Sequence, residues 1–176
     1  VLDPVAVGAL PVRTALAHEL LEHRPAIIRG NASEILALGG AGAGGRGVDA
    51  TDSAEDALDA ARSLAIRTGG TVAVSGETDL IVDATRTARV TGGSALLTKV
   101  IGGGCALGAA MASLLAVAPA FDAASAASAI WAVASERAAS RTGGPGSFAV
   151  AFLDELAAIQ PADLDGRVRV DTEVAR

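Results

Sequence analysis

Gly102, Gly103 and Gly104 directly precede Cys105, the only cysteine in the chain. Because glycine has no Cβ, a backbone built from it can come close to a ligand. A helix that began here would turn several unpaired N–H groups outward and create an anion site. A phosphoryl group in transfer suits such a site, because its charge must be met by donors already in place. From the first helical turn, Cys105 could orient a substrate hydroxyl or take its proton. The alternative is a helix-packing glycine cluster with an inert buried thiol, and the residues alone leave both open.

A second polar cluster follows the apolar segment 26–28. Arg29 can pair with phosphate oxygens through its planar fork. Glu34 can reach a hydrated Mg²⁺, which uses one or two carboxylates together with substrate phosphates. Asp3, at the end of another apolar pair, is a second carboxylate for the metal. A capped helix with a solvated arginine is the favoured alternative on the residues alone, and Asp3 could equally be a turn residue.

Composition limits the possible functions of the 176 residues. The chain is 51% hydrophobic with 21 glycines and 2% aromatic residues, so its core must be built from small aliphatic side chains. Its 14 Lys and Arg are scattered against 20 Asp and Glu, which disfavours nucleic acid as a partner. One cysteine excludes an intramolecular disulfide framework and a cysteine-rich zinc site. With no leader pattern visible, we expect a cytoplasmic protein.

Residues 100–121 form an uncharged run that is long enough to cross a bilayer. The run is rich in Gly and Ala and contains Pro119. A helix that is apolar all round can also lie in the core of a globular domain. We therefore expect a buried helix over 102–118 and no membrane contact, with a membrane fragment as the alternative.

The elements that must position these residues alternate in the first half of the chain. Helical spacing is predicted over 11–24, 53–68, 120–140 and 145–160, with a short helix capped by Asn31 and ended by Gly39. Strands are predicted at 26–28 and 71–74, and an antiparallel pair at 79–84 and 88–91. This order predicts βαβ units in an α/β fold with a mainly parallel central sheet, covered by a helical second half. Ligands of such folds lie at the carboxyl ends of the strands, which selects Asp3, residues 29–34 and 75–79, and the glycines before Cys105.

Other patterns in the sequence do not indicate a functional site. Residues 42–47 spell G-x-G-x-x-G, but the string follows a helix and is interpreted as a flexible loop rather than a dinucleotide site. No Gly-Lys-Ser/Thr occurs anywhere in the sequence. His18 and His23 are spaced five apart on a helix and are expected to be partly exposed rather than ligands. Met111 and Trp131 are expected in the core.

Six blocks occur in the order typical of one enzyme family. They are residues 3–9, 28–35, 74–79, 97–100, 102–107 and 144–148. Over residues 1 to about 160 the chain resembles the hydroxyethylthiazole kinases. The resemblance implies a ribokinase-like, three-layer α/β/α fold. It also implies transfer of the ATP γ-phosphoryl group to the hydroxyl of 4-methyl-5-(2-hydroxyethyl)thiazole, a step in thiamine salvage.

The resemblance also assigns roles to individual residues. It implies that Arg29 and Ser75 contact ATP and that Asp3 and Glu34 hold Mg²⁺, directly or through water. It implies that Gly102 borders the thiazole and that Gly102, Gly103 and Gly104 form the anion hole. Cys105 takes the position of a catalytic aspartate in most ribokinase relatives, and its expected role is that of an orienter and partial base.

Two departures from the family pattern stand out. Ile101 replaces a usual Thr, which removes a hydroxyl donor beside the phosphate. About the first third of the family chain has no counterpart, so residues 1–176 are expected to be the C-terminal two-thirds of a single kinase domain. In the family that third supplies early strands, a thiazole-contacting segment and much of a trimer surface, and the active sites lie between subunits.

Residues 1–176 alone are therefore expected to be inactive or insoluble. The alternatives to a thiazole kinase are another ribokinase-like kinase of the hydroxymethylpyrimidine type and a nucleotide-binding module without catalysis.

Overall fold

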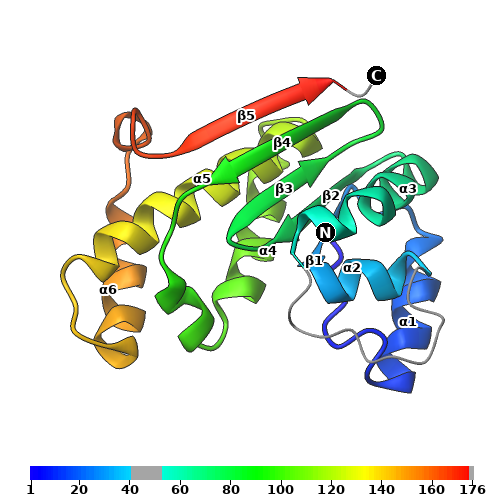
Figure 1. Cartoon of the computed structure of the whole chain (residues 1–176), viewed down its shortest axis with the longest axis horizontal. Helices are drawn as coiled ribbons and strands as arrows, with labels where there is room; N and C mark the ends of the chain where they lie inside the picture. The colour runs from blue at the N-terminus through cyan, green and yellow to red at the C-terminus, as the bar shows by residue number, and fades with distance from the viewer. Residues whose placement is uncertain (41–52, 175–176) are drawn as a thin grey trace.

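The computed structural model describes residues 1–40 and 53–174. Its strands are β1 (Ile27–Asn31), β2 (Thr71–Ser75), β3 (Thr78–Val82), β4 (Arg86–Thr91) and β5 (Arg169–Val174). Its α-helices are α1 (Pro11–Leu21), α2 (Ala32–Leu38), α3 (Leu58–Thr68), α4 (Gly103–Leu114), α5 (Ala120–Ala139) and α6 (Pro145–Ala158). Three 3-10 helices, η1 (Glu55–Ala57), η2 (Ala95–Lys99) and η3 (Pro161–Asp163), complete the elements (Figure 1).

The five strands form one sheet in the order β1-β2-β3-β4-β5. Only β1 and β2 pair in parallel, from Ile27 opposite Thr71 to Asn31 opposite Ser75, and Leu2 adds a parallel bridge to Ile28. The other three pairs are antiparallel. The prediction of a mainly parallel sheet is therefore wrong for the described strands. The cause is local: only Gly76 and Glu77 separate β2 from β3, and so short a connection must reverse the chain.

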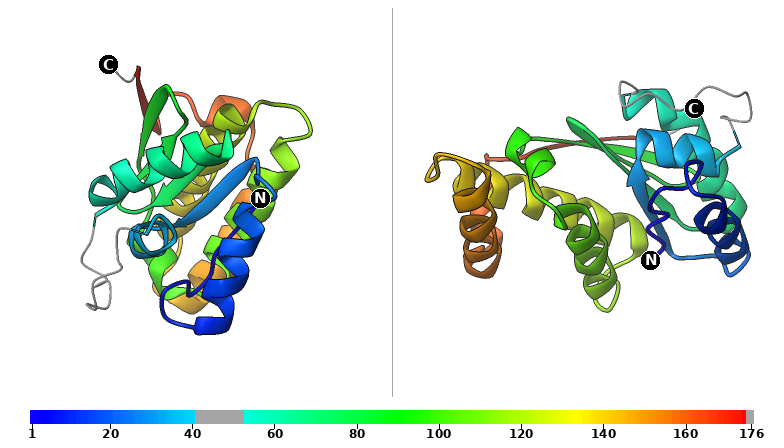
Figure 2. Two further views of the ribbon diagram at one scale, coloured as in Figure 1. Left: turned by 90° about the vertical axis from the view of Figure 1, so that its right-hand side faces the viewer. Right: turned by 90° about the horizontal axis from the view of Figure 1, so that it is seen from below.

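Alternating side chains divide the apolar residues of the sheet between two faces. Val72 and Val74 of β2 pack with α2 and α3, whereas Ala73 between them packs with α4 and α5. Ile28 and Ile27 of β1 divide in the same way. Figure 2 shows α2 and α3 on one side of the sheet and α4 and α5 on the other. The expected three-layer α/β/α architecture is confirmed.

The uncharged run 100–121 does not form one buried helix. It is divided between α4 and the start of α5, and only Leu107, Gly108 and Met111 of α4 are buried. Among the described residues, no helix combines the length and the apolar character that crossing a bilayer requires. The expectation of a helix buried on all sides is wrong, because α4 lies on one face of the sheet and leaves its other side uncovered.

Two features at the C-terminal end differ from the expectation that the helical second half covers the sheet. Helix α6 packs on α5 through Phe148 and Phe152 instead of on the strands. Strand β5, which was not predicted, pairs along the whole of β4 and is exposed at every position. The G-x-G-x-x-G string at 42–47 lies outside the described residues.

Candidate functional site

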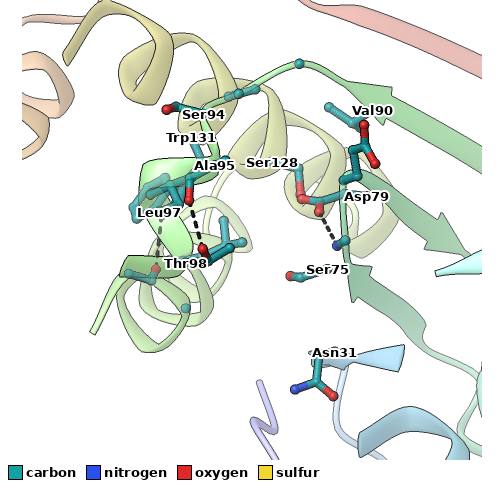
Figure 3. A pocket seen from close by; sticks show the side chains of 18 of the residues that line it. Asn31, Ser75, Asp79, Val90, Ser94, Ala95, Leu97, Thr98, Ser128 and Trp131 are labelled. Atoms are coloured by element: carbon teal, nitrogen blue, oxygen red, sulfur yellow. Dashed lines mark hydrogen bonds between the residues drawn. The ribbon is translucent and has the colours of Figure 1, made fainter. Parts of the chain in front are cut away.

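A cleft of about 700 Å³ opens at the carboxyl ends of β1 and β2. Its wall also includes the β2–β3 turn, the end of β4 with the glycines that follow it, and η2. The first turn of α4 and the middle of α5 close the other side (Figure 3). The ends of β1 and β2, which were predicted to carry the site, therefore line one cleft, whereas Asp3 and Glu34 are not part of its wall.

Arg29 lies at the centre of the contacts at one end of this cleft. Its Nε and Nη2 donate to the Ser75 Oγ at 3.2 and 2.9 Å, and its Nη1 lies 3.6 Å from the Asp3 Oδ2. A Cβ on Gly104 would come within 2.5 Å of that Nη1, so the guanidinium is packed directly against the first turn of α4. The structure thus brings together Arg29, Ser75, Asp3 and Gly104, which the sequence places far apart.

Glu34 completes the cap that was predicted for α2. The Asn31 side chain accepts the Glu34 N–H at 2.9 Å, and the Glu34 Oε2 accepts the Asn31 N–H at 2.9 Å. The Glu34 Oε1 accepts the Ala6 N–H at 3.2 Å, which ties the loop after Asp3 to the same helix start. Both carboxylate oxygens of Glu34 therefore already receive a backbone donor.

Asp3 differs from Glu34 in this respect. Both of its carboxylate oxygens are buried and have no hydrogen-bond partner among the described residues. Burial raises the pKa of Asp3; the Arg29 guanidinium opposes this shift, and the negative charge of Glu34 adds to it. Asp3 is thus a buried carboxylate whose oxygens are free to meet a cation.

The glycine turn begins α4 as predicted. Gly102 is the N-cap, and its φ of +91° lies in the left-handed region that favours glycine. The first intrahelical bond runs from the Ala106 N–H to the Gly102 carbonyl, so the N–H groups of the preceding turn point out of the helix. Trp131 Nε1 on α5 donates to the Gly103 carbonyl oxygen at 3.1 Å and fixes this turn from behind.

The residues predicted to lie beside the thiazole and its hydroxyl are not all in the cleft wall. Cys105 is exposed and is not part of the cleft wall, so the alternative of an inert buried thiol is wrong. Gly103 and Gly104 line the cleft, but Gly102 does not. Ile101 is 105% exposed. These positions lie on the open outer side of the α4 start.

Two further residues of the cleft wall had no predicted role there, and a third, Asp79, belongs to the segment 75–79 that was predicted to carry the site. Asp79 lies near the start of β3, and Ser128 and Trp131 lie on α5. Burial raises the pKa of Asp79, against the opposing effects of the Gly76 N–H, the Ser128 hydroxyl and the Arg29 charge. Trp131 was expected in the core, where Met111 does lie, but it is only half-buried and faces the cleft. Alanine-rich α5 gives little periodicity from which this face could be found.

The arrangement is suited to binding an anion beside a cation. A guanidinium and free helix N–H groups converge at one end of the cleft. Next to them lies the Asp3 carboxylate, which is 3.6 Å from the guanidinium and has no hydrogen-bond partner among the described residues. A phosphate group would receive charge-assisted hydrogen bonds from the first two, while the carboxylate would take the positive counter-ion.

Comparisons with known proteins identify relatives of this chain. The model of the hydroxyethylthiazole kinase family matches residues 1–162. A hydroxyethylthiazole kinase of Kineococcus radiotolerans is 54% identical over 176 residues, which are 99% of this chain and 62% of that protein. One of Clavibacter sepedonicus is 59% identical over 162 residues, 92% of this chain and 59% of that protein. The chain thus spans about 60% of the length of these curated relatives.

Solved structures give the same result for the fold. The structure of the hydroxyethylthiazole kinase protein from Pyrococcus horikoshii OT3 matches with a TM-score of 0.86 and 32% identity, over 97% of this chain and 64% of that one. Pyridoxal kinase from Staphylococcus aureus in complex with AMP-PCP and pyridoxal matches with a TM-score of 0.65 and 21% identity, over 98% of this chain and 61% of that one. The expected ribokinase-like α/β fold is confirmed, with the mixed sheet described above.

Proposed function

The chain belongs to the hydroxyethylthiazole kinase family, and we propose that it provides the nucleotide-binding part of an enzyme that phosphorylates the hydroxyl of 4-methyl-5-(2-hydroxyethyl)thiazole with ATP. The observation that carries the proposal is the contact between Arg29 and Gly104 inside the cleft. It places a permanent positive charge against the amino end of a twelve-residue helix. Both attract the same phosphate oxygens.

In this proposal Arg29, Ser75 and the N–H groups of the α4 start hold the phosphates of ATP. Ser75 fixes the guanidinium before the nucleotide arrives, so the donors are in place without reorganisation. Gly104 contributes by lacking a side chain, because any Cβ there would displace Arg29. The phosphoryl group in transfer would lie between the guanidinium and the helix start.

The residues present fit a magnesium ion. The oxygens of Asp3 are buried and have no hydrogen-bond partner among the described residues, which is the state expected of a carboxylate that meets a cation. Glu34 would hold the ion through water, since each of its oxygens already accepts an N–H group. When bound, the ion would neutralise phosphate charge that Arg29 alone leaves uncompensated.

On the acceptor side, Gly102 would border the thiazole, and Cys105 would orient its hydroxyl or take its proton. Both are exposed, and the chain spans only about 60% of its curated relatives. We therefore propose that the acceptor pocket is completed outside residues 1–176, in a homotrimer with sites shared between subunits. A cytoplasmic location follows from the requirement for ATP.

The exposure of Cys105 outside the cleft wall favours one second candidate, a nucleotide-binding module without catalysis. The two candidates differ in turnover. The test adds Mg²⁺, ATP and the thiazole alcohol to the full gene product and measures ADP release, with Cys105→Ala and Ser113→Ala compared. Ser113 is an exposed serine further along α4 that is outside the cleft wall.

We expect Cys105→Ala to lower kcat by at least about 100-fold, the range of general acid–base contributions, and Ser113→Ala to leave it unchanged. ATP-dependent thermal stabilisation without ADP release would instead identify a binding module.

A further inference from the structure

The cleft contains one polar pair that the phosphate and metal contacts do not use. It consists of Asp79 on β3 and Ser128 on α5, which Figure 3 shows side by side in the wall. They belong to different layers of the fold and meet only at the cleft. Their chemistry is that of hydrogen-bond acceptors with one hydroxyl, unlike the cationic end around Arg29.

Asp79 is held in a fixed orientation. Its Oδ1 accepts the Gly76 N–H at 3.0 Å across the β2–β3 turn. This bond accounts for one oxygen and leaves the other available to a ligand. Burial raises the pKa of Asp79, so keeping a carboxylate at this position is unfavourable for the free protein.

Ser128 gives stronger evidence for a ligand contact than Asp79 does. The residue is 2% exposed, and its Oγ has no hydrogen-bond partner within the described part of the chain. The hydroxyl lies beside the Asp79 carboxylate and lowers its pKa. A buried hydroxyl without a partner costs stability, so its position in a cleft wall points to a partner that arrives with the ligand.

The other residues of the cleft indicate which part of the ligand would lie beside Asp79 and Ser128. Phosphates are attracted to Arg29 and the α4 start, and a carboxylate repels them. The group beside Asp79 is therefore not a phosphate, and an uncharged hydrogen-bond donor of the ligand suits both the carboxylate and the neighbouring hydroxyl. Further along, the wall becomes apolar at Val90, Leu97 and Trp131, which suits a flat base.

We propose that Asp79 and Ser128 bind the ribose hydroxyls of the phosphoryl donor and so select a ribonucleotide. This inference rests on the proposed function, because it takes the cleft to be the site of ATP. Two neighbouring hydroxyls provide the two donors that a carboxylate and a serine can share. The pair would fix the position of the nucleoside while Arg29 fixes the phosphates.

The test compares ADP with 2′,3′-dideoxy-ADP by calorimetry on the full gene product, in EDTA so that no metal contributes. The measured quantity is the ratio of the two dissociation constants. We expect the unmodified protein to bind ADP at least about tenfold more tightly, the range for hydrogen bonds to a charged group. Asp79→Asn keeps an acceptor for the Gly76 N–H, and it should reduce the ratio to about threefold or less because the charge is lost.

Ser128→Ala separates a ligand contact from a structural one. Removing an unpaired hydroxyl should leave the melting temperature of the free protein unchanged or raise it, while the ratio falls about threefold. Ser135→Ala is the matched control on the same helix. Ser135 is also buried, but its Oγ donates to the Ala132 carbonyl and accepts the Ser94 N–H, so its loss should lower the melting temperature.

Each other result overturns the inference. Equal binding of the two nucleotides by the unmodified protein, or an unchanged ratio in Asp79→Asn, would show that the pair makes no ribose contact. A fall in melting temperature for Ser128→Ala as large as for Ser135→Ala would show a structural hydroxyl. Failure to bind ADP at all would remove the proposed function together with this inference, whereas the preceding results would leave that function standing.

Discussion

The proposed site has a nucleotide end, around Arg29, and an acceptor end, around Cys105, and the two differ in how exposed their residues are. At the nucleotide end, the side chains of Arg29 and Asp3 are only 14% and 20% exposed, and Arg29 is fixed by Ser75. At the acceptor end, Cys105 is exposed and Ile101 is 105% exposed. The two ends adjoin at the start of α4: Cys105 directly follows Gly104, and Ile101 directly precedes the N-cap Gly102.

This difference suggests that nucleotide binding and acceptor binding depend on different parts of the structure. The contacts proposed to hold a nucleotide are formed within the chain before any ligand is bound, so we expect nucleotide binding not to need a partner. The acceptor end has its candidate residues in place but no wall around them. Nucleotide affinity and acceptor affinity should therefore respond to different substitutions.

Replacing Arg29 by Ala should have the largest effect. It removes two donors from the phosphate end and leaves Asp3 without its positive neighbour. We expect ADP affinity to fall on the order of 100-fold, as measured by calorimetry. Arg62→Ala is the matched control, because Arg62 also donates to a hydroxyl, the Thr87 Oγ1 at 2.6 Å, but lies outside the cleft wall. A similar loss of affinity in both variants would contradict a specific phosphate contact.

Gly104→Ala should act on the same guanidinium from the helix side. Its Cβ would lie 2.5 Å from the Arg29 Nη1, so the guanidinium must move away from Ser75. ADP affinity should fall about tenfold, equivalent to about 1.4 kcal/mol. At Gly108, in the same helix, a Cβ would lie 3.9 Å from the Asp3 Oδ2, an ordinary contact. Gly108→Ala should leave ADP affinity unchanged and stabilise the helix by up to about 1 kcal/mol.

Asp3→Asn should have a smaller effect than the preceding substitutions, and it should raise the stability of the protein at pH 7. Because burial raises the pKa of Asp3 above 3.8, the folded state binds more protons than the unfolded state between pH 3.8 and that raised pKa. The free energy of unfolding therefore falls as pH rises through this window. The variant avoids this loss, so its melting temperature at pH 7 should exceed that of the unmodified protein by a few degrees at most. The gain should vanish below about pH 3.8, where both states carry a protonated Asp3.

Asp83→Asn provides the contrasting case. Burial alone would raise the pKa of Asp83, but the N–H groups of Thr85 and Arg86 and the Arg86 side chain together hold it below 3.8. Here the ionised form stabilises the fold at pH 7, and the variant should melt at a lower temperature. If both variants shifted the melting temperature in the same direction, the assignment of Asp3 as a carboxylate whose ionised form is destabilised by burial would be wrong.

The sequence was sufficient to predict where α2 and α4 begin because the signals for both helix starts are local. Asn31 and Glu34 have the spacing of a capping box, and Gly102 to Gly104 mark a helix start. These patterns follow from hydrogen bonds within four residues, so they need no knowledge of the fold. The contact of Arg29 with Gly104, by contrast, joins two such signals that only the folded chain brings together.

Three features could not be predicted from the sequence, for different physical reasons. The direction of β3 was predicted wrongly because the prediction of a parallel sheet rested on the alternation of elements. It did not consider the length of the turn formed by Gly76 and Glu77. Strand β5 was missed because it is exposed throughout and has no buried face to create a pattern. Ser128 was missed because α5 is so rich in alanine that its faces hardly differ.

Ile101→Thr should have the smallest effect and should probe only the acceptor end. The side chain is fully exposed, so the free energy of unfolding should change by no more than about 0.5 kcal/mol, and ADP affinity should remain the same. The new hydroxyl lies just before the glycine turn, where a donor could act on a phosphoryl group in transfer. In the full gene product we expect kcat to rise while the KM for ATP stays constant. A changed ADP affinity would show that the nucleotide end and the acceptor end are not independent, because the effect of an exposed substitution before the α4 N-cap would then reach the Arg29 site.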